Sequence, residues 1–416
     1  MINPNSINKL LDGVEVEWKP LGEVGKFTRG KRFVKTDMLS EGFPCIHYGE
    51  MYTHYNIWAN TPKSFLSHDL AAKLRVANHG DVVIVAAGET IEDIGNGTAW
   101  LGNTGVVIHD ACFSYRSSLN PKYVSYFLRT KHFHDQIKKH ISTGKISAIN
   151  ETGLRKAKIP IPPPEVQEEI VRILDAFTEL TAKLTAELTA EFTARKKQYT
   201  YYRDKLLTFD EGEVEWKTLG AVGELVRGNG LPKTDFTECG VPAIHYGQIY
   251  TYYGTFTTET KSFVSYETAQ KLKTVDTGDV VITNTSENLD DVGKAVAYLG
   301  KVQAVTGGHA TIFKPSNQIS GKYLAYFTQT QMFANQKRKY AKGTKVIDVS
   351  ATDMSKIIIP IPPLTDQERI VSILDKFDAL TSSITEGLRR EIELRKKQYE
   401  YYRNMLLSFP KSEVEA

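Results

Sequence analysis

Two sets of side chains in this sequence combine the residue types of acid–base chemistry. Each set has one imidazole and two carboxylates, and the sets are His47, Glu89 and Asp93, then His245, Glu287 and Asp291. Such groups can move protons at a reacting centre. The same repetition is expected of two copies that bind one kind of ligand, and catalysis in both copies is disfavoured.

Other catalytic signatures are missing from the sequence. It has no Gly-x-x-x-x-Gly-Lys-Ser/Thr phosphate loop, no Gly-x-Gly-x-x-Gly dinucleotide loop, no His-Glu-x-x-His and no Asn-Pro-Pro-aromatic run. His132 and His134 would point to different faces of a helix, so we expect surface residues and no metal site. Cys112 near His109 is a weak pair, because its counterpart is Ala310.

Composition sets broad limits on the function. The chain has 416 residues, a net charge of +3 and three cysteines, none of them in a Cys-x-x-Cys pair. This length suits two or more domains, and the cysteine usage indicates neither a disulfide framework nor a zinc ribbon. The weak net charge alone does not argue for nucleic acid. Residues 1–11 contain no apolar signal core and no apolar run has the length of a membrane span, so we expect a cytoplasmic protein.

The chain repeats itself. Blocks that match at an offset of 198, and at 200 after an insertion near Gln318, include 15–22 with 213–220, 44–49 with 242–247, 159–163 with 359–363, and 195–199 with 395–399. A repeat must be recognised before a fold is assigned. Lys9–Leu11 also resembles Lys205–Leu207, so the first copy begins with the tail of a helix. This circular order predicts a pseudo-twofold arrangement.

Each copy begins with a strand-rich globular part. Apolar runs between glycine and asparagine turns predict strands over 81–86, around Trp100, over 106–108 and over 280–282. The apolar spacing predicts one helix over 122–140 and its repeat over 322–339.

A long helix follows each globular part. Prolines at 160–164 end the extended region, Pro164 suits the first helical turn, and Thr365–Glu368 predicts a capping box. Apolar residues then recur at spacings of three and four, including Leu180 and Leu380. Some 42 residues give a rod of roughly 63 Å, too long to be covered by one small domain. We therefore expect the two helices to pair antiparallel, rather than each lying on its own domain.

Several motifs together resemble the specificity subunit of type I restriction–modification enzymes. They are the Ile-Pro-Ile-Pro-Pro blocks, the Gln-x-x-Ile-Val-x-Ile-Leu-Asp segments at 167–175 and 367–375, the Arg-Lys-Lys-Gln-Tyr blocks, and the tandem Thr-Ala-Lys/Glu-Leu/Phe units from Thr181. The resemblance covers essentially the whole chain. It implies an α+β fold, with two strand-rich target-recognition domains in pseudo-twofold arrangement joined by two long antiparallel helices in a coiled coil. The expected parts are an N-terminal segment (1–14) that completes the second helical region, recognition domains at 15–163 and 209–363, and helical regions at 164–208 and 364–410.

The resemblance also implies partners. The chain would be non-catalytic, read a split DNA site with one half per domain, and dock two modification subunits that use S-adenosylmethionine to methylate adenine. Restriction subunits that use ATP with Mg would join through them, and this chain itself would hold no cofactor. A coiled-coil scaffold with two protein-binding heads remains an alternative, as does an enzyme with duplicated sites.

Candidate DNA contacts lie in polar and glycine-rich loops. Arg suits guanine edges or phosphates, Lys suits phosphates, and carboxylates accept from cytosine amines. The candidates are Arg29, Lys31, Lys35, His47, Tyr48, Tyr52, Glu89, Asp93, Lys145, Arg227, Lys233, His245, Tyr246, Tyr250, Glu287, Asp291 and Lys345. Structural roles compete, since Tyr and His are often half-buried and Asp often makes turns. The candidates for helix pairing are Phe177, Leu184, Leu188, Phe192, Phe377, Ile384, Leu388 and Ile392.

Overall fold

The computed structural model describes residues 16–409, apart from the side chains of Ile384 and Thr385. It divides into two compact units, Met1–Glu187 with Arg390–Ala416, and Leu188–Arg389. Each unit therefore contains one globular head and parts of both long helices. The predicted helical tail within residues 1–14 lies outside the described residues.

A five-stranded sheet forms the centre of the first head. Its order is β2 (Gly25–Arg29), β11 (Cys112–Ser117), β7 (Val82–Val85), β9 (Gly97–Trp100) and β4 (Trp58–Ala59). All four residues of β7 are buried, which fits the continuous apolar run that predicted this strand. Helix α5 (Pro121–Phe127) packs on β9, and its aromatic residues join the main core of the unit.

Smaller sheets complete this head. One has the order β5 (Ser64–Leu66), β3 (Phe43–Ile46), β10 (Val106–Ile108) and β6 (Val76–Ala77). Another joins β12 (Ile141–Ser142), β13 (Ser147–Ile149) and β8 (Ala87–Gly88), and a third pairs β1 (Glu17–Pro20) with β14 (Lys158–Ile161). The short helical segments are α2 (Leu21–Val24), η1 (Lys35–Asp37), α3 (Tyr48–Thr53), α4 (His68–Ala71), η2 (Ile91–Asp93), α6 (Lys131–Ile137), η3 (Lys138–His140) and α7 (Glu151–Arg155).

The second head repeats this plan. Its main sheet has the order β16 (Gly223–Arg227), β26 (Ala310–Pro315), β22 (Val280–Thr283), β24 (Ala295–Tyr298) and β19 (Phe256–Thr257). The others are β17 (Phe236–Thr237), β20 (Ser262–Val264), β18 (Val241–Ile244), β25 (Ala304–Thr306) and β21 (Lys273–Val275), then β23 (Thr285–Ser286) with β27 (Ile347–Asp348), and β15 (Glu215–Thr218) with β28 (Ile358–Ile361). The helical segments are α9 (Leu219–Val222), η4 (Lys233–Asp235), α10 (Tyr246–Thr251), α11 (Tyr266–Ala269), α12 (Gly321–Phe327), α13 (Gln331–Tyr340) and α14 (Ala351–Met354).

The single helix predicted over 122–140 is wrong. The chain forms α5 and α6 with a break between them, and the second head has the corresponding break between α12 and α13. Thr130 causes a new start, because its hydroxyl oxygen accepts a hydrogen bond from the Phe133 amide at 3.2 Å. Thr330 does the same in the second head. The apolar spacing predicted the helical character but not this cap.

The two long helices are α8 (Pro164–Leu206) and α15 (Leu364–Leu406). Pro164 is the first helical residue of α8, as predicted. The predicted capping box is wrong, because α15 begins at Leu364 and Thr365 therefore lies inside its first turn. The amides of Asp366 and Gln367 instead donate to the Pro363 carbonyl.

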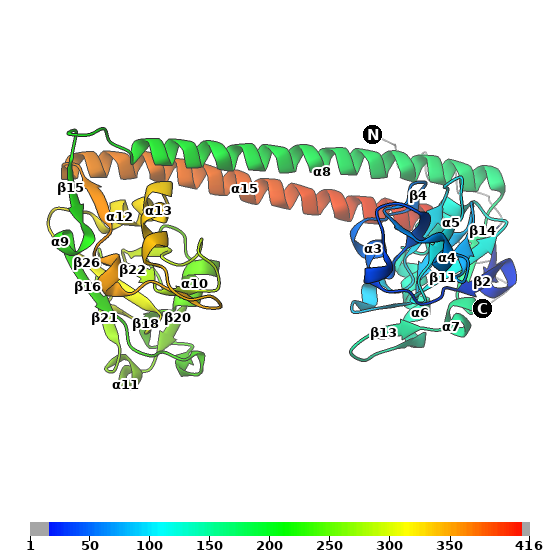
Figure 1. Ribbon diagram of the computed structural model, residues 1–416, viewed down its shortest axis with the longest axis horizontal. Coiled ribbons are helices and arrows are strands. Elements are labelled where there is room, and N and C mark those ends of the chain that lie inside the picture. Colours follow the sequence, from blue (N-terminus) through cyan, green and yellow to red (C-terminus); the bar gives the residue numbers. More distant parts are fainter. Residues whose placement is uncertain (1–15, 410–416) are drawn as a thin grey trace. The chain divides into compact units, whose positions relative to one another are not determined.

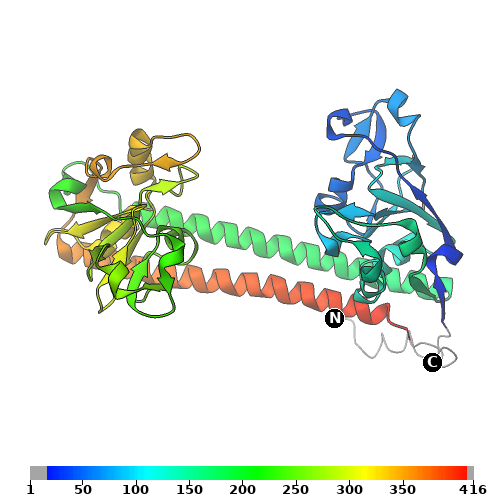
Figure 2. The ribbon, with the colours of Figure 1, turned by 90° about the horizontal axis from the view of Figure 1, so that it is seen from below.

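The helices pair antiparallel within each unit. In the first unit the Phe177 and Tyr402 rings stack with centroids 5.3 Å apart, and Thr178 donates to the Tyr399 hydroxyl at 3.1 Å. In the second unit Tyr202 stacks on Phe377 at 6.0 Å. Figures 1 and 2 show α8 and α15 side by side in both units. The predicted fold class, α+β with strand-rich heads and long antiparallel helices, is confirmed.

The apolar stripe is less completely covered than predicted. Leu180 and Leu380 are 62% and 58% exposed, although both belong to the stripe. Tyr201 and Tyr401 are also exposed, at 61% and 63%. Two helices cannot cover all the apolar surface that this pattern supplies. Within the described part of the chain, every helix is too short or too polar to span a bilayer.

Candidate nucleic-acid interface

A cavity of about 440 Å³ lies in the first head. It gathers five of the candidate residues, which are Arg29, Lys35, His47, Tyr48 and Glu89. They come from the end of β2, from η1, from the start of α3 and from the turn after β8. Segments far apart in sequence thus meet at one concave surface.

Three of the rings that line this cavity contact one another. His47 lies 4.7 Å from His109 and 4.5 Å from Tyr48, and Tyr48 lies 5.0 Å from His109, measured between ring centroids. His47 is the N-cap of α3, and its Nδ1 accepts a hydrogen bond from the Gly49 amide at 3.2 Å. Burial lowers the pKa of His47, and the nearby His109 lowers it further. Burial also lowers the pKa of His109, although the Asp110 carboxylate at 2.9 Å opposes this shift.

Tyr52 has a structural role. Its hydroxyl donates to the Ala87 carbonyl at 2.8 Å, and burial raises its pKa. A Cβ atom added at Gly88 would lie 2.3 Å from that hydroxyl. Tyr52 therefore supports strand β8 from behind and does not line the cavity.

The basic residues of β2 and the following loop are partly engaged by the protein itself. Arg29 donates through Nε to the Asp110 carbonyl at 2.9 Å, and Lys31 donates to the Lys73 carbonyl at 2.8 Å. Arg75 in turn donates to the Arg29 carbonyl at 2.6 Å. Arg29 keeps its remaining donors at the cavity, whereas Lys31 is directed to the neighbouring backbone.

Glu89, Asp93 and Lys145 are connected through the small three-stranded sheet. Ser147 of β13 pairs with Gly88 of β8, which brings the loop that carries Lys145 to the turn that carries Glu89. Glu89 and Lys145 are exposed, and Asp93 lies at the end of η2 and is partly buried. Of these three, only Glu89 lines the cavity.

The second head places its candidates on equivalent elements. His245 is the N-cap of α10, and its Nδ1 accepts from the Gly247 amide at 3.1 Å. Tyr246 lies 4.8 Å from His309. Burial lowers the pKa of His245, and Lys233 in η4 lowers it further. Lys345 is exposed in the loop before β27.

Arg227 is more constrained than its counterpart Arg29. It donates to the Gly308 carbonyl at 3.3 Å and pairs with the Asp348 carboxylate at 3.5 Å. A base or phosphate that binds Arg227 must therefore compete with Asp348.

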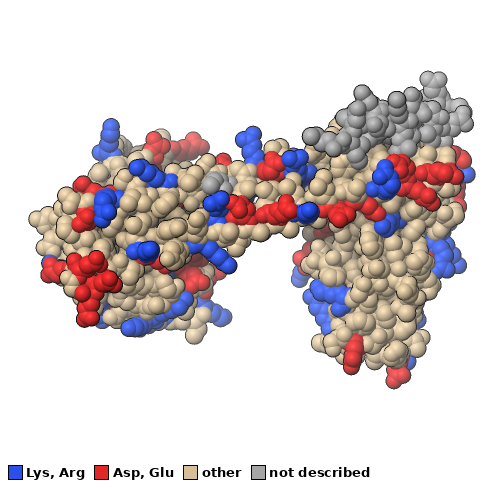
Figure 3. All heavy atoms as spheres, turned by 90° about the horizontal axis from the view of Figure 1, so that it is seen from above, with Lys and Arg blue, Asp and Glu red and all other residues tan. Residues whose placement is uncertain are grey.

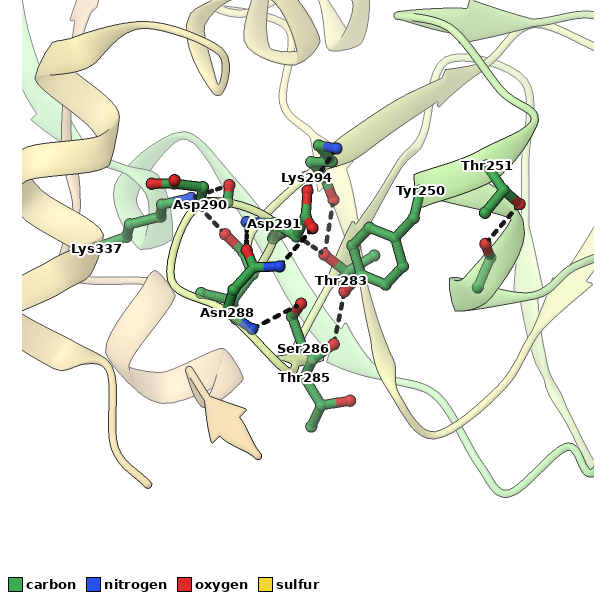
Figure 4. A network of polar contacts seen from close by, with 12 residues as sticks. Tyr250, Thr251, Thr283, Thr285, Ser286, Asn288, Asp290, Asp291, Lys294 and Lys337 are labelled. Atoms are coloured by element: carbon green, nitrogen blue, oxygen red, sulfur yellow. Dashed lines mark hydrogen bonds and ion pairs between the residues drawn. The ribbon is translucent and has the colours of Figure 1, made fainter. Parts of the chain in front are cut away.

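The acidic loop of the second head is held by a polar network (Figure 4). Asp291 pairs with Lys294 at 2.6 Å and accepts from the Asn288 side chain at 2.8 Å. Tyr250 donates to the Thr285 carbonyl at 2.5 Å, like Tyr52 in the first head. Glu287 is exposed on this loop. Asp291 is thus neutralised from within the protein, while Glu287 is open to a ligand.

Lys337 holds the same loop in place through hydrogen bonds to its backbone. Its buried ammonium group donates to the carbonyls of Asp290 at 2.9 Å and Val292 at 2.5 Å. Burial lowers the pKa of Lys337 to about 8. The first head has Ile137 at this position, packed against Gly95, so the two acidic loops are held by different chemistry.

Sequence reasoning missed three polar residues of the cavity, which are Arg32, His109 and Asp110. His109 aligns with Gly307 at the offset of 198, so the repeat gave no signal for it. The ring of His309, two positions further along, occupies the equivalent place against Tyr246. The two heads therefore place a histidine ring against the tyrosine from different sequence positions.

The helix motifs repeated at 167–175 and 367–375 anchor each head to its helix. Asp175 accepts from the Lys122 ammonium and the Tyr126 hydroxyl, both at 2.7 Å. Asp375 accepts in the same way from Lys322 at 2.6 Å and Tyr326 at 2.8 Å. Gln167 accepts from the Asn120 amide at 3.0 Å. The repeated motif therefore attaches each head to a long helix.

The candidates for helix pairing lie along the facing sides of α8 and α15. Phe177 and Phe377 make the ring stacks, and Arg389 lies over the Phe192 ring at 5.9 Å. Leu184, Leu188, Leu388 and Ile392 are half-buried. The Ile384 side chain lies outside the described residues.

Charge is mixed over the surface. Figure 3 shows basic and acidic side chains interspersed along the exposed face of the long helices and on the visible parts of both heads. Among residues 16–409, no cluster of three or more His, Cys, Asp or Glu side chains is arranged to hold a metal ion.

Two strand-rich heads, each anchored by the same contacts to paired long helices, define a duplicated recognition architecture. A family model for the type I restriction modification DNA specificity domain matches residues 13–193 and 211–394. The chain belongs to this family of type I restriction–modification specificity subunits.

Relatives match over nearly the full length. The chain is 35% identical over 427 aligned residues to the type I restriction enzyme EcoR124I/EcoR124II specificity subunit of Escherichia coli, covering 98% of both chains. It is 32% identical to a putative type I restriction enzyme specificity subunit of Haemophilus influenzae, covering 98% of this chain and 99% of the relative.

Solved structures show the same fold. One, described as showing the complex assembly and conformational transition of the type I R-M system, matches with a TM-score of 0.72 and 17% identity, covering 95% of this chain and 98% of that one. The HsdS subunit from Thermoanaerobacter tengcongensis matches with a TM-score of 0.53 and 18% identity, covering 94% and 95%.

Proposed function

We propose that this chain selects the DNA target of a type I restriction–modification complex, with each head reading one half of a bipartite site. The observation that carries this proposal is the duplication of the whole recognition surface. Each head presents a His-Tyr pair at the start of a short helix, a basic residue at the end of a strand and an acidic residue on a neighbouring turn. These are side chains that contact base edges and phosphates.

The long helices would set the distance between the half-sites. The internal repeat places the same elements in the same order in both heads, and we propose that the two half-sites are read on opposite strands. Because the heads have similar sequences, the two halves of the site are expected to be partly inverted repeats. The turns at Ala87–Glu92 and Thr285–Asp290 differ, so full palindromy is not expected.

The exposed apolar residues of the helices would receive the partner subunits. Leu180, Leu380, Tyr201 and Tyr401 repeat at equivalent positions in the two helices, which suits two copies of one partner. Exposed apolar patches of this kind mark protein–protein contacts. The partners would be two modification subunits that bind S-adenosylmethionine, and restriction subunits that use ATP and Mg. Methylation and cleavage would reside in them, in the cytoplasm, and this chain would itself catalyse nothing.

Mapping of methylated adenines in host DNA tests the proposal. The chain is co-expressed with its modification subunit, and a matched strain lacks only this chain. A split motif with a fixed gap that disappears without the chain supports the proposal. A motif that persists unchanged without the chain rejects it and favours a scaffold with two protein-binding heads.

A further inference from the structure

A second cavity, of about 500 Å³, lies in the first unit between the head and the last turns of α15. It is separate from the candidate DNA surface, since the two cavities share none of their lining residues. Its basic lining residues are Arg129, Lys131, His134, Lys138 and Arg403. Its acidic lining residues are Glu92, Asp135 and Glu400.

Within residues 16–409, two guanidinium groups in this cavity lack a carboxylate partner. The Nε atoms of Arg129 and Arg403 are buried and have no hydrogen-bond partner. Within the described part of the chain, Arg129 otherwise donates to the carbonyls of Asn56 at 3.0 Å and Gly97 at 3.2 Å. Arg403 lies over the Tyr399 ring at 5.7 Å. A buried N–H group of a cation that is left without an acceptor is costly, so an acceptor bound beside these two groups would stabilise the first unit.

The nearby charges do not supply that acceptor from within the described residues. Asp135 is occupied by Lys131 at 2.9 Å. Burial lowers the pKa of Arg403, and Tyr399 and Glu400 only partly oppose that shift. Burial lowers the pKa of Arg129 to about 10, and the charge of Arg403 lowers it further. Burial, followed by the charges of Arg403 and Arg129, also lowers the pKa of His134. The two arginines thus repel each other across the cavity.

The second unit shows how the same place is built without an anion. Gln329 replaces Arg129 and donates to the Thr255 hydroxyl at 2.9 Å. Arg203, the counterpart of Arg403, pairs with Asp204 at 2.7 Å, whereas the first unit has Asn404 in place of that aspartate. The attachment of a head to its helix therefore does not require two unpaired arginines. This attachment alone does not explain their presence in the first unit.

We propose that this cavity binds a phosphate group between Arg129 and Arg403. Two guanidinium groups offer forked donors that match a tetrahedral oxyanion, and the cavity is large enough for a phosphate ester. A bound phosphate neutralises the repulsion and joins α15 to the first head. The phosphate comes either from a free phosphate compound or from a DNA backbone.

Calorimetric titration of the full chain with inorganic phosphate, at constant ionic strength, tests this site. R129Q and N404D each install the residue of the second unit, and N404D supplies an internal carboxylate while keeping both arginines. We expect one phosphate site in the wild-type chain, at least tenfold weaker binding in both variants, and unchanged binding in R203Q. Because N404D keeps both arginines, it still tests the site if R129Q fails to fold. Absence of binding, or equal binding by wild type and N404D, overturns the proposal.

A second arm separates the two sources. Displacement of phosphate by a short DNA duplex supports the site and assigns its phosphate to the DNA backbone. Simultaneous binding of phosphate and duplex supports the site and assigns it to a free phosphate compound. Wild-type chain that is stabilised thermally by chloride as much as by phosphate contradicts the site.

Discussion

One aspartate in each long helix accepts two of the hydrogen bonds that attach a head to that helix, and the cost of its removal can be estimated from these bonds. Asp175 accepts from the Lys122 ammonium and the Tyr126 hydroxyl, both at 2.7 Å. Hydrogen bonds to charged groups contribute about 1.5–3 kcal/mol each when buried. The side chains of Lys122 and Asp175 are 21% and 32% exposed, so the upper limit does not apply. We expect D175A to destabilise the first unit by about 3 kcal/mol in total, the sum of two bonds at the lower limit.

Chemical denaturation of matched variants measures this cost. D375A removes the equivalent acceptor of Lys322 and Tyr326 and should destabilise the second unit by a similar amount. D175N keeps an oxygen acceptor, so about 1 kcal/mol is expected. E169Q disrupts an exposed pair with Arg172 on the same helix and serves as the control, with no change expected. The reasoning is refuted if D175A and D375A unfold like the wild type, or if E169Q costs as much as they do.

Three further predictions concern the rod, the histidines and the buried lysine. Deletion of Thr185–Leu188 removes about one turn, roughly 6 Å, so methylation mapping should show a shorter gap between unchanged half-sites; an unchanged gap would exclude the rod as the spacer. Because burial lowers the pKa of His47 and His245 below 6.5, the unfolded chain binds more protons as the pH falls. Stability should therefore decline from pH 6.5 downward, and denaturation series should show a shallower decline for H47N with H245N. Burial lowers the pKa of Lys337 from 10.5 to about 8, so stability of the second unit should rise between these values, and K337I should remove that rise in the same assay.

The large features of the fold could be predicted because periodic patterns in the sequence indicate them. Two apolar stripes of helical spacing and a register kept over two copies predict the paired helices and the duplicated heads. The pattern could not show where the stripe is left open, because Leu180 and Leu380 have the same residue type as the covered positions. A side chain that a partner buries is of the same apolar type as one buried within the chain, so the sequence does not distinguish the two cases.

Local breaks were harder to predict. Thr130 and Thr330 look like ordinary helix residues in a helical pattern, and their capping becomes visible only from the Phe133 and Phe333 amides. Thr365 shows the opposite case, since a capping motif is present but the helix already begins at Leu364, where the Pro363 carbonyl accepts from the Asp366 and Gln367 amides. Where a helical pattern and a capping residue give different predictions, the tertiary structure determines which one the chain follows.

Within the candidate site, the repeat identified Arg29, His47, Tyr48 and Glu89 as equivalents of residues in the second head, and the cavity contains all four. It could not identify His109, whose counterpart ring comes from a shifted position. Nor could it show that Arg227 and Asp291 are already paired within the protein. Their role as DNA contacts stays a prediction.

Duplication of one head tests the central claim most directly, namely that each head reads its own half-site. In this variant, residues 15–163 replace residues 209–363, and the anchoring Lys and Tyr residues are kept because both heads carry them. Methylated adenines are then mapped in cells that also express the modification subunit. The account predicts a site of two identical inverted halves, both matching the half read by the first head. Retention of the original bipartite motif would contradict it.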